Sequence, residues 1–298
     1  MQAILITAYT EWDLLLRLVG KFDNSFNIYI HIDAKVNIPT LVKLELEKIS
    51  NIRFVGQVYK VNWGGMRHVD AIMHLCDLAL SDTANTYFHL ISGVDYPLYP
   101  TRFLHELNTQ YNYLETFSLP SSNWEGGGCN RIEYYHLLDN LDIKKEREYN
   151  RYLESLERQK RSGIKRETPS SPLYGGSTWW SLSRHCLEYI IKNSCSLYDS
   201  LVDTFVPEEI LFPTIFQRYP NAETLVNKNL RYIDWTYRNG NAPAVLDMSD
   251  LIAMMQGPFL FARKFSHHSE KILDKIDDWQ KNIQLSDFKQ EFITIDHM

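Results

Sequence analysis

The sequence predicts an α/β protein with a mixed, mostly parallel β-sheet flanked by helices. Over the first hundred residues, short apolar runs rich in β-branched side chains alternate with segments in which apolar residues recur at helical spacing. Polar or aromatic residues stand just past several of the apolar runs, where sheets of this kind bind their ligands. With 298 residues, the chain can bury a substantial core in one large domain or two small ones.

The expected elements follow from these runs in chain order. Strands are expected at 3–9, 27–33, 52–56 and 87–93. Helices are expected at 10–22, 41–49 and 68–80, and a closing helical tail, which we interpret as a packing element, over 269–298. The first helix has Thr10 as its candidate N-cap, with Asp13 three residues further on. Helices between successive strands favour parallel pairing of those strands.

The ends of the expected strands place several residues along one edge of the sheet. Tyr9, Asp33, Trp63 and Asp95 each lie at or just past a strand end. Because ligands of parallel sheets bind at the carboxyl ends of the strands, these four residues are candidates for ligand contacts.

Residues 144–167 differ in character from the rest of the chain. They contain nine Lys or Arg and five Glu, which gives this stretch a local charge of +4. One interpretation is a solvated helix and loop. The other is a basic surface that meets anionic lipid or a lipid-diphosphate acceptor.

The net charge, the apolar segments and the cysteine spacing exclude several classes of protein. A net charge of −6 and a pI of about 5.9 argue against a nucleic-acid partner. The first residues lack a basic region, and no window of about eighteen apolar residues occurs, so we expect neither a signal peptide nor a spanning helix. The four cysteines show no metal-ligand spacing. We therefore expect a cytoplasmic protein, with peripheral contact to the inner membrane face through 144–167 as an extension.

The motifs of several common chemistries are missing. GxGxxG, GxxxxGK[ST], GxSxG and HExxH do not occur. An Asp-x-Asp, with which a nucleotide-sugar transferase usually holds a divalent cation, is also absent; DKIDD at 274–278 comes nearest but lies on the tail helix. A bound diphosphate would then need Lys and Arg to balance its charge, and Arg263 and Lys264 in GPFLFARKF could supply them.

Seven short segments, taken together, match the pattern of a known family. In chain order they are IYIHIDAK (28–35), VNWGGMRHVDAIMHLCDLAL (61–80), FHLISGVDYPLYP (88–100), YGGSTWWSLSRHCLEYII (174–191), VPEEILFPTIF (206–216), LRYIDW (230–235) and FARKF (261–265). No single segment is specific to this family. The occurrence of all seven in the same order, along most of the chain, is specific. The chain resembles a bacterial-type member of the family of core-2/I-branching β-1,6-N-acetylglucosaminyltransferases and peptide O-xylosyltransferases.

The resemblance implies a single GT-A-type, Rossmann-like domain over 1–298. It also implies a UDP-sugar donor and inversion at the anomeric carbon, with no metal or other cofactor. The Glu that closes the family's Pro-Asp/Glu-Glu motif is the catalytic base and falls on Glu209. Donor contacts are expected from the strand-end residues Ala8, Asp33, Trp63 and Asp95 and, on the diphosphate, from Arg263 and Lys264.

The chain departs from the family pattern at three places. Tyr9 follows the first strand where the family usually has His. The core-2 branch has an Arg upstream of the Lys for the diphosphate, and the corresponding stretch here, NAPAVLDMSD (241–250), has none, so Arg263 must serve. Thr178, after GGS, occupies a position that varies with donor class. N-acetylglucosamine is the expected donor sugar, and xylose or another hexose is the alternative.

The two adjacent glutamates of TFVPEEILFPTIFQ (204–217) cannot easily face one substrate, because neighbouring helical residues point about 100° apart. Pro207 suits the first helical turn, and there Glu208 complements the helix dipole. Pro213 lacks an N–H, which leaves the carbonyl of Glu209 without its helical partner. We expect this irregularity to help present Glu209 to a cleft.

Four residues are candidates for contacts with the acceptor. Trp179 and Trp180 would point to opposite faces of a strand, so one would enter the core and the other could stack on a sugar ring. Glu115 and Arg131 could bind acceptor hydroxyls, and loop salt bridges are the alternative.

These features predict an inverting, metal-independent glycosyltransferase that moves a sugar from a UDP-sugar to a glycan or lipid-linked oligosaccharide in surface polysaccharide synthesis. One alternative is a non-catalytic protein that binds sugar nucleotides or glycans. The other is a glycoside hydrolase, which normally needs a second carboxylate facing Glu209. Asp95 is the residue that could supply it.

Overall fold

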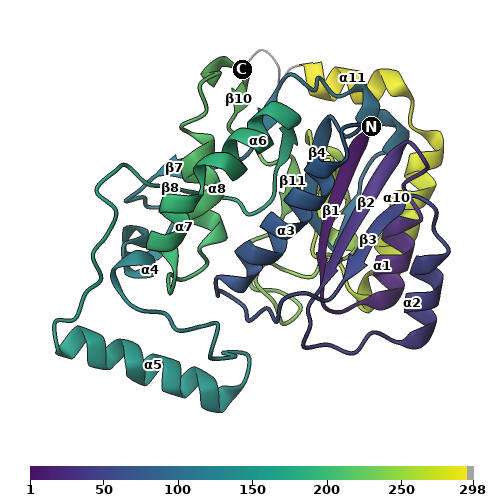
Figure 1. The fold of residues 1–298 in the computed structure, drawn as a ribbon. Helices are drawn as coiled ribbons and strands as arrows, with labels where there is room; N and C mark the ends of the chain where they lie inside the picture. The colour runs from purple at the N-terminus through teal and green to yellow at the C-terminus, as the bar shows by residue number, and fades with distance from the viewer. Residues whose placement is uncertain (294–298) are drawn as a thin grey trace.

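A computed structural model describes residues 1–293 of the chain, and it confirms the predicted α/β fold (Figure 1). The strands are β1 (Gln2–Ala8), β2 (Phe26–Ile32), β3 (Ile52–Gly56), β4 (Tyr87–Ser92), β5 (Asp95–Pro97), β6 (Asn112–Tyr113), β7 (Thr116–Ser118), β8 (Tyr174–Gly176), β9 (Ser181–Ser183), β10 (Leu225–Val226), β11 (Arg231–Ile233) and β12 (Phe261–Arg263). The helices are α1 (Trp12–Val19), α2 (Thr40–Glu47), α3 (Arg67–Ser81), α4 (Asn130–Glu133), α5 (Glu146–Arg161), α6 (Arg184–Asn193), α7 (Cys195–Leu201), α8 (Glu208–Phe216), α9 (Leu251–Met255), α10 (Glu270–Asn282) and α11 (Leu285–Ile293).

Within the described chain, seven strands form the main sheet in the order β10-β6-β9-β4-β1-β2-β3. The pairs β4-β1, β1-β2 and β2-β3 are parallel, as expected for strands joined by helices. Strand β9 runs antiparallel to β4 and β6, which makes the sheet mixed. A second sheet, β11-β12-β5, brings residues that follow β4 next to the first three residues of the FARKF segment.

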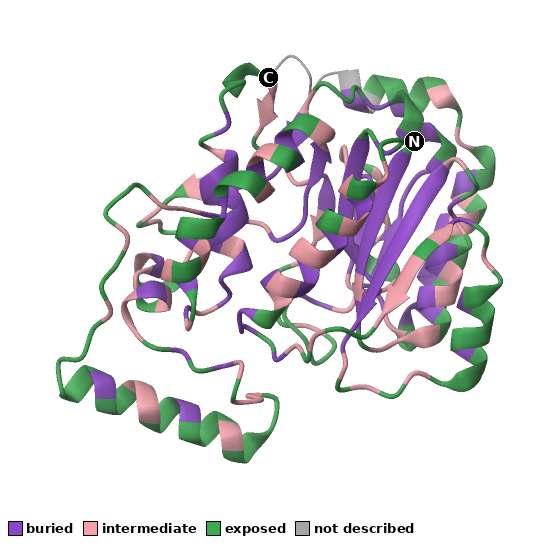
Figure 2. Cartoon of the chain, in the orientation of Figure 1, coloured by how far each residue is buried: buried purple, intermediate pink, exposed green. Residues whose placement is uncertain are grey.

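Both faces of the main sheet are covered, and alternate residues of β1 show how. Ile4 and Ile6 pack into one core with α1, α2 and α10, whereas Ala3 and Leu5 pack into a second core with α3, α6 and α8. Figure 2 shows the central strands as a continuous buried layer between partly exposed helices. Near-continuous apolar runs such as β1 are typical of parallel strands with both faces buried.

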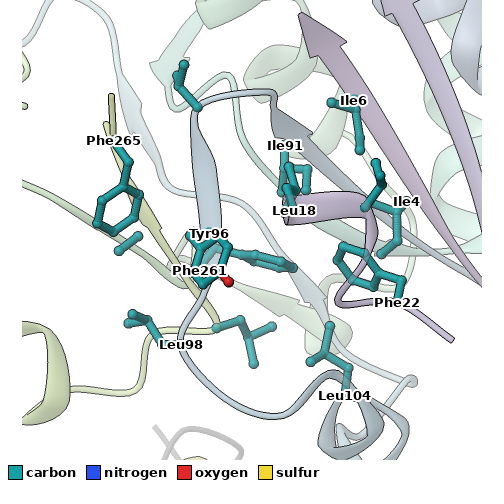
Figure 3. Packing of buried hydrophobic residues seen from close by; sticks show 14 of the residues in the cluster. Ile4, Ile6, Leu18, Phe22, Ile91, Tyr96, Leu98, Leu104, Phe261 and Phe265 are labelled. Carbon is teal, nitrogen blue, oxygen red and sulfur yellow. The ribbon is translucent and has the colours of Figure 1, made fainter. Parts of the chain in front are cut away.

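The first core continues from the main sheet to the second sheet. Figure 3 shows Ile4, Ile6 and Phe22 on one side of this packing and Tyr96 and Phe261 on the other. All five side chains are buried. This shared packing fixes β12, and therefore the chain just after it, relative to the ends of β1 and β4.

The structure corrects the predicted start of the first helix. Thr10 is not the N-cap; α1 begins at Trp12, and Glu11 takes the N-cap position in a left-handed conformation with φ 55°. The Glu11 carboxylate accepts a hydrogen bond from the backbone N–H of His267 at 2.8 Å instead of capping the helix. The contact connects the loop after β1 to the segment that follows β12.

The predicted basic segment forms α5, which lies apart from the main sheet (Figure 1). Tyr152 and Gln159 attach it: the Tyr152 hydroxyl lies 2.8 Å from His136 Nδ1, and Gln159 Nε2 donates to the carbonyl of Tyr135 at 3.0 Å. The other face of α5 is exposed, as the interpretation of a solvated helix requires. No helix in residues 1–293 is long and apolar enough to cross a membrane.

The C-terminal tail contains two helices, α10 and α11, and residues 294–298 of the predicted tail lie outside the described chain. Asp274 and Asp277, from the DKIDD stretch, both accept hydrogen bonds from Arg17 at 2.7 Å. The Asp277 carboxylate also lies 2.5 Å from Lys21 Nζ. These carboxylates therefore attach the tail to α1, and their role is structural.

Candidate active site

The carboxyl ends of β1, β2 and β4 meet at one edge of the main sheet. The Asp33 N–H donates to the Ala8 carbonyl and the Gly93 N–H to the Thr7 carbonyl, both at 2.9 Å. A Cβ on Gly93 would lie 2.9 Å from the Ala8 Cβ, so glycine allows the chain after β4 to pass close to Ala8. Ala8 is buried and uses its carbonyl within the sheet, which leaves little of it for a ligand.

Asp33 organises the loop that follows β3. Its Oδ1 accepts hydrogen bonds from the backbone N–H groups of Lys35 at 2.9 Å and Val61 at 3.0 Å. Lys35 Nζ lies 3.7 Å from Asp33 Oδ2 and donates to Asn62 Oδ1 at 2.7 Å. The predicted nucleoside-side carboxylate thus shapes the loop that leads to Trp63.

Trp63 lies beside the segment that enters α8. Its side chain is 53% exposed, and its ring meets the ring of Phe205 edge-on at 5.3 Å. The next residue, Gly64, has φ 82°, a conformation that favours glycine, and its carbonyl accepts from the Val206 N–H at 2.9 Å. The WGG turn therefore links the strand-end residues to the proposed base helix.

Arg263, at the end of β12, is held by a buried carboxylate. Its Nε lies 2.9 Å from Asp95 Oδ1, and its Cζ lies 4.3 Å from the centre of the Trp179 ring. Asp95 is fully buried and also accepts from the Ser92 N–H at 3.0 Å. Donor contact by Asp95 stays a prediction; in the structure its two oxygens accept hydrogen bonds from Arg263 and Ser92. The same contacts remove Asp95 as a second hydrolytic carboxylate facing Glu209.

Lys264 follows Arg263 and is half-buried without a counter-charge. Among residues 1–293, no carboxylate lies within ion-pair distance of its Nζ. Burial, together with the nearby cations Arg263 and Lys144, lowers the pKa of Lys264 to about 8. Cations gathered in this way favour an anionic ligand.

Glu209 lies in the first turn of α8 and faces Arg131. Its Oε2 is 2.7 Å from Arg131 Nη1. Burial raises the pKa of Glu209 to about 7, Glu208 raises it as well, and Arg131 and Arg263 act in the opposite direction. Arg263 is therefore close enough to this carboxylate to influence its ionisation. A carboxylate with this pKa can accept a proton near neutral pH.

The neighbouring Glu208 points elsewhere, as the helical geometry predicted. It is buried, and its Oε1 lies 2.7 Å from His68 Nδ1. His68 Nε2 lies 3.4 Å from the Thr7 hydroxyl, and the His68 ring meets Trp179 edge-on at 6.5 Å. Pro213 lies inside α8, as predicted, and Glu209 is turned toward Arg131 and not toward the outer surface.

The two tryptophans separate as expected, but only one is at the site. Trp179 lies between Arg263 and His68. Trp180 is fully buried in the core beside Phe212. The prediction that Trp180 contacts the acceptor is wrong, because no face of its ring reaches solvent.

Arg131 packs on a wall of aromatic side chains next to the base. The Cζ of Arg131 lies 3.6 Å from the centre of the Trp124 ring, and Trp124 meets Phe117 edge-on at 5.1 Å. A Cβ on Gly128 would lie 2.6 Å from the Trp124 ring, so this glycine allows the ring to pack there. The sequence left Arg131 open as an acceptor ligand or as part of a loop salt bridge, and the structure shows it in an ion pair with Glu209.

The wall continues into a cavity of about 590 Å³. Glu115 and Asn229 line it, and Asn229 Nδ2 donates to Glu115 Oε2 at 2.7 Å. Burial raises the pKa of Glu115 above its ordinary value. Trp235, which also lines the cavity, is largely exposed. A cavity that joins a carboxylate, amides and exposed aromatic rings suits the hydroxyls and apolar faces of a sugar.

Sequence reasoning missed two side chains that the structure brings to the site. His68 was part of the WGG segment, and only the fold shows that it reaches Glu208. Lys144 belonged to the basic segment, and only the fold shows that it reaches Tyr9. Within residues 1–293, no three His, Cys, Asp or Glu side chains gather where they could hold a metal ion.

Comparison with protein families gives a match over most of the chain. The model described as "Branch: Core-2/I-Branching enzyme" matches residues 3–254. Xylosyltransferase 1 of Rattus norvegicus is 23% identical over 278 residues, which cover 84% of this chain and 32% of that protein. Xylosyltransferase 2 of Rattus norvegicus is 26% identical over 297 residues, with coverages of 88% and 31%. The chain thus spans about a third of the length of these relatives.

Comparison with solved structures gives weaker likenesses. S. aureus TarS 1–349 in complex with UDP-GlcNAc has a TM-score of 0.26 and 14% identity over 46% of this chain and 38% of that one. A putative glucose-1-phosphate thymidylyltransferase from Bacillus anthracis has a TM-score of 0.37 and 12% identity, with coverages of 95% and 97%. The assignment of the fold therefore rests on the sheet topology and on the family match.

Proposed function

This chain belongs to the Core-2/I-Branching enzyme family, and on that premise we propose that it is an inverting, metal-independent glycosyltransferase with a UDP-sugar donor. One observation carries the proposal. A carboxylate with a pKa of about 7, Glu209, and the cations Arg263 and Lys264 gather around one site, with Trp179 against Arg263. The reaction needs a base that takes the proton of the acceptor hydroxyl and cations that bind the diphosphate.

In the proposed reaction, the carboxylate of Glu209 takes the proton of an acceptor hydroxyl as that oxygen attacks the anomeric carbon. The bond from the anomeric carbon to the diphosphate breaks on the opposite side, and UDP leaves with its electron pair. Arg263 and Lys264 stabilise the negative charge that develops on UDP. Asp95 holds Arg263 in position, and this buried pair is therefore a positioning element.

Two donor sugars are candidates. N-acetylglucosamine follows from the core-2 branch of the family, and xylose is favoured by the xylosyltransferase relatives. The acceptor that we propose is a glycan or lipid-linked oligosaccharide whose sugars occupy the cavity beside Glu115. Surface polysaccharide synthesis in the cytoplasm, at the inner membrane face, is the corresponding proposed role.

Titration of the purified chain with a panel of nucleotide sugars in EDTA tests this function. We expect one UDP-sugar to bind with an affinity that chelation does not change, because protein cations replace the metal. Incubation of that donor with oligosaccharide acceptors should then give a β-linked product. Failure of every nucleotide sugar to bind, or a requirement for a divalent cation, would refute the proposal.

The pH dependence of the reaction should report the contact between Arg131 and Glu209. Glu209 must be ionised to act as a base, so kcat/KM should rise with pH along a limb centred near 7, before Lys264 loses its proton at a pKa of about 8 and donor binding weakens. Arg131 lowers the pKa of Glu209, so in Arg131→Ala the rising limb should move to higher pH by roughly one unit or more. Arg131→Lys, which keeps the charge, should show a smaller displacement. A limb that stays in place or moves to lower pH in Arg131→Ala would contradict this assignment.

A further inference from the structure

Lys144, in the loop between α4 and α5, reaches the end of β1. Its Nζ lies 4.3 Å from the centre of the Tyr9 ring, and Tyr9 directly follows Ala8. An ammonium above the face of a tyrosine ring is attracted by the negative charge density there. The contact brings a cation from the basic segment to the edge of the sheet where β1, β2 and β4 end.

The loop that carries Lys144 is attached to the strand-end residues. Asn62 Nδ2 donates to the Leu138 carbonyl at 2.8 Å, and Asp142 Oδ2 lies 3.8 Å from Lys35 Nζ. Lys35 in turn donates to Asn62 Oδ1 at 2.7 Å. These contacts therefore hold the backbone near Lys144 beside the loop organised by Asp33.

The charge around Lys144 is not balanced by the protein. Within the described residues, neither Lys144 nor Lys264 has a carboxylate at ion-pair distance, whereas the neighbouring Lys145 lies 3.7 Å from Asp142 and 3.4 Å from Glu148. Lys144 is also close enough to Lys264 to contribute to the lowered pKa of that residue. Like charges repel one another, so an anion between them would relieve an unfavourable interaction.

We propose that Lys144 is a third cation of the donor-diphosphate site, held by Tyr9 and acting together with Arg263 and Lys264. This inference rests on the proposed function, because it assumes that the anion is the diphosphate of a nucleotide sugar. It assigns a ligand contact to one residue of the basic segment, while α5, which follows that residue, lies apart from the main sheet.

Calorimetric titrations of the full chain with uridine, UMP and UDP test the assignment. Lys144→Ala should weaken UDP binding roughly tenfold, which corresponds to the loss of one charge-assisted contact, and should leave uridine binding unchanged. Lys145→Ala is the matched control, because Lys145 is adjacent and exposed but already paired, and it should bind UDP like the wild type. The difference between the two variants should shrink at high salt, as expected for an exposed ammonium.

Two results would overturn the inference while leaving the proposed function intact. In the first, Lys144→Ala binds UDP as tightly as the wild type and Lys145→Ala do. In the second, Lys144→Ala loses uridine and UDP binding to the same extent, which would make Lys144 a support for the loop and not a diphosphate ligand. If the wild type binds neither UDP nor any UDP-sugar, the proposed function fails and this inference fails with it.

Discussion

Glu209→Gln is expected to lower turnover by about 10²–10⁴-fold while donor affinity stays within a factor of about two of the wild type. The amide has nearly the shape of the carboxylate but cannot accept the proton of the acceptor hydroxyl. Donor binding should survive because the diphosphate cations are separate residues, Arg263 and Lys264. Turnover is followed by product formation at saturating donor and acceptor, and donor affinity by calorimetry on the same preparation.

Glu208→Gln is the matched control, since it makes the same chemical change at the adjacent position. Glu208 faces His68 and raises the pKa of Glu209, so its replacement should keep turnover and move the rising limb of the pH profile to lower pH. Equal inactivity of both variants, with both folded by thermal melting, would mean that Glu209 has no special role. Full turnover of Glu209→Gln would show that Glu209 is not the base, whereas a wild type that binds the donor but forms no product would favour the non-catalytic binding protein.

The first half of the fold could be predicted because its pattern is local. Apolar runs and helical spacing marked β1 to β4 and the helices between them to within two or three residues. The second sheet was not foreseen, because β5, β11 and β12 are three residues long and show no period. Its consequence for the site is large, since it joins Asp95 to Arg263 across most of the chain.

The limits of the sequence are clearest at Asp95 and Trp180. A carboxylate just past a strand end suggests a ligand contact, but here a buried arginine from a distant segment uses it. Trp180 and Trp179 are neighbours with the same chemistry, and only the packing against Phe212 shows which of them is in the core. The partner of a carboxylate and the burial of an aromatic ring depend on residues that are distant in the sequence and pack against them in the fold. The local sequence therefore does not predict them.

Glu209 is the opposite case, because the resemblance of its segment to the family motif singled it out, and the local sequence agreed. The proline before it and the proline inside the helix marked an irregular, capped helix, and the adjacent carboxylate had to point away. The structure added the ion pair with Arg131 and the burial that raises the pKa of Glu209 to about 7. The sequence thus named the candidate base, and the fold gives its carboxylate a pKa that suits the proposed role.

Lys264→Ala should weaken binding of the UDP-sugar roughly ten- to hundredfold, since it removes a half-buried cation worth about 1.5–3 kcal/mol to a diphosphate. The unliganded variant should be at least as stable as the wild type, because the ammonium is partly desolvated and has no carboxylate partner within residues 1–293. A thermal melt therefore separates loss of a ligand contact from loss of the fold. Lys264→Arg, which keeps the charge, should retain more affinity than Lys264→Ala.

The lowered pKa of Lys264 adds a test that a purely structural residue would not pass. The free protein loses the Lys264 proton at a pKa of about 8, and a bound diphosphate favours the charged form, so the pKa must rise on binding. Near pH 8 and just above, binding should then take up a proton, and affinity should fall as pH rises through this range. Calorimetry in buffers of different ionisation enthalpy measures that uptake directly. Uptake that persists unchanged in Lys264→Ala would assign the proton to another group and would separate Lys264 from the diphosphate.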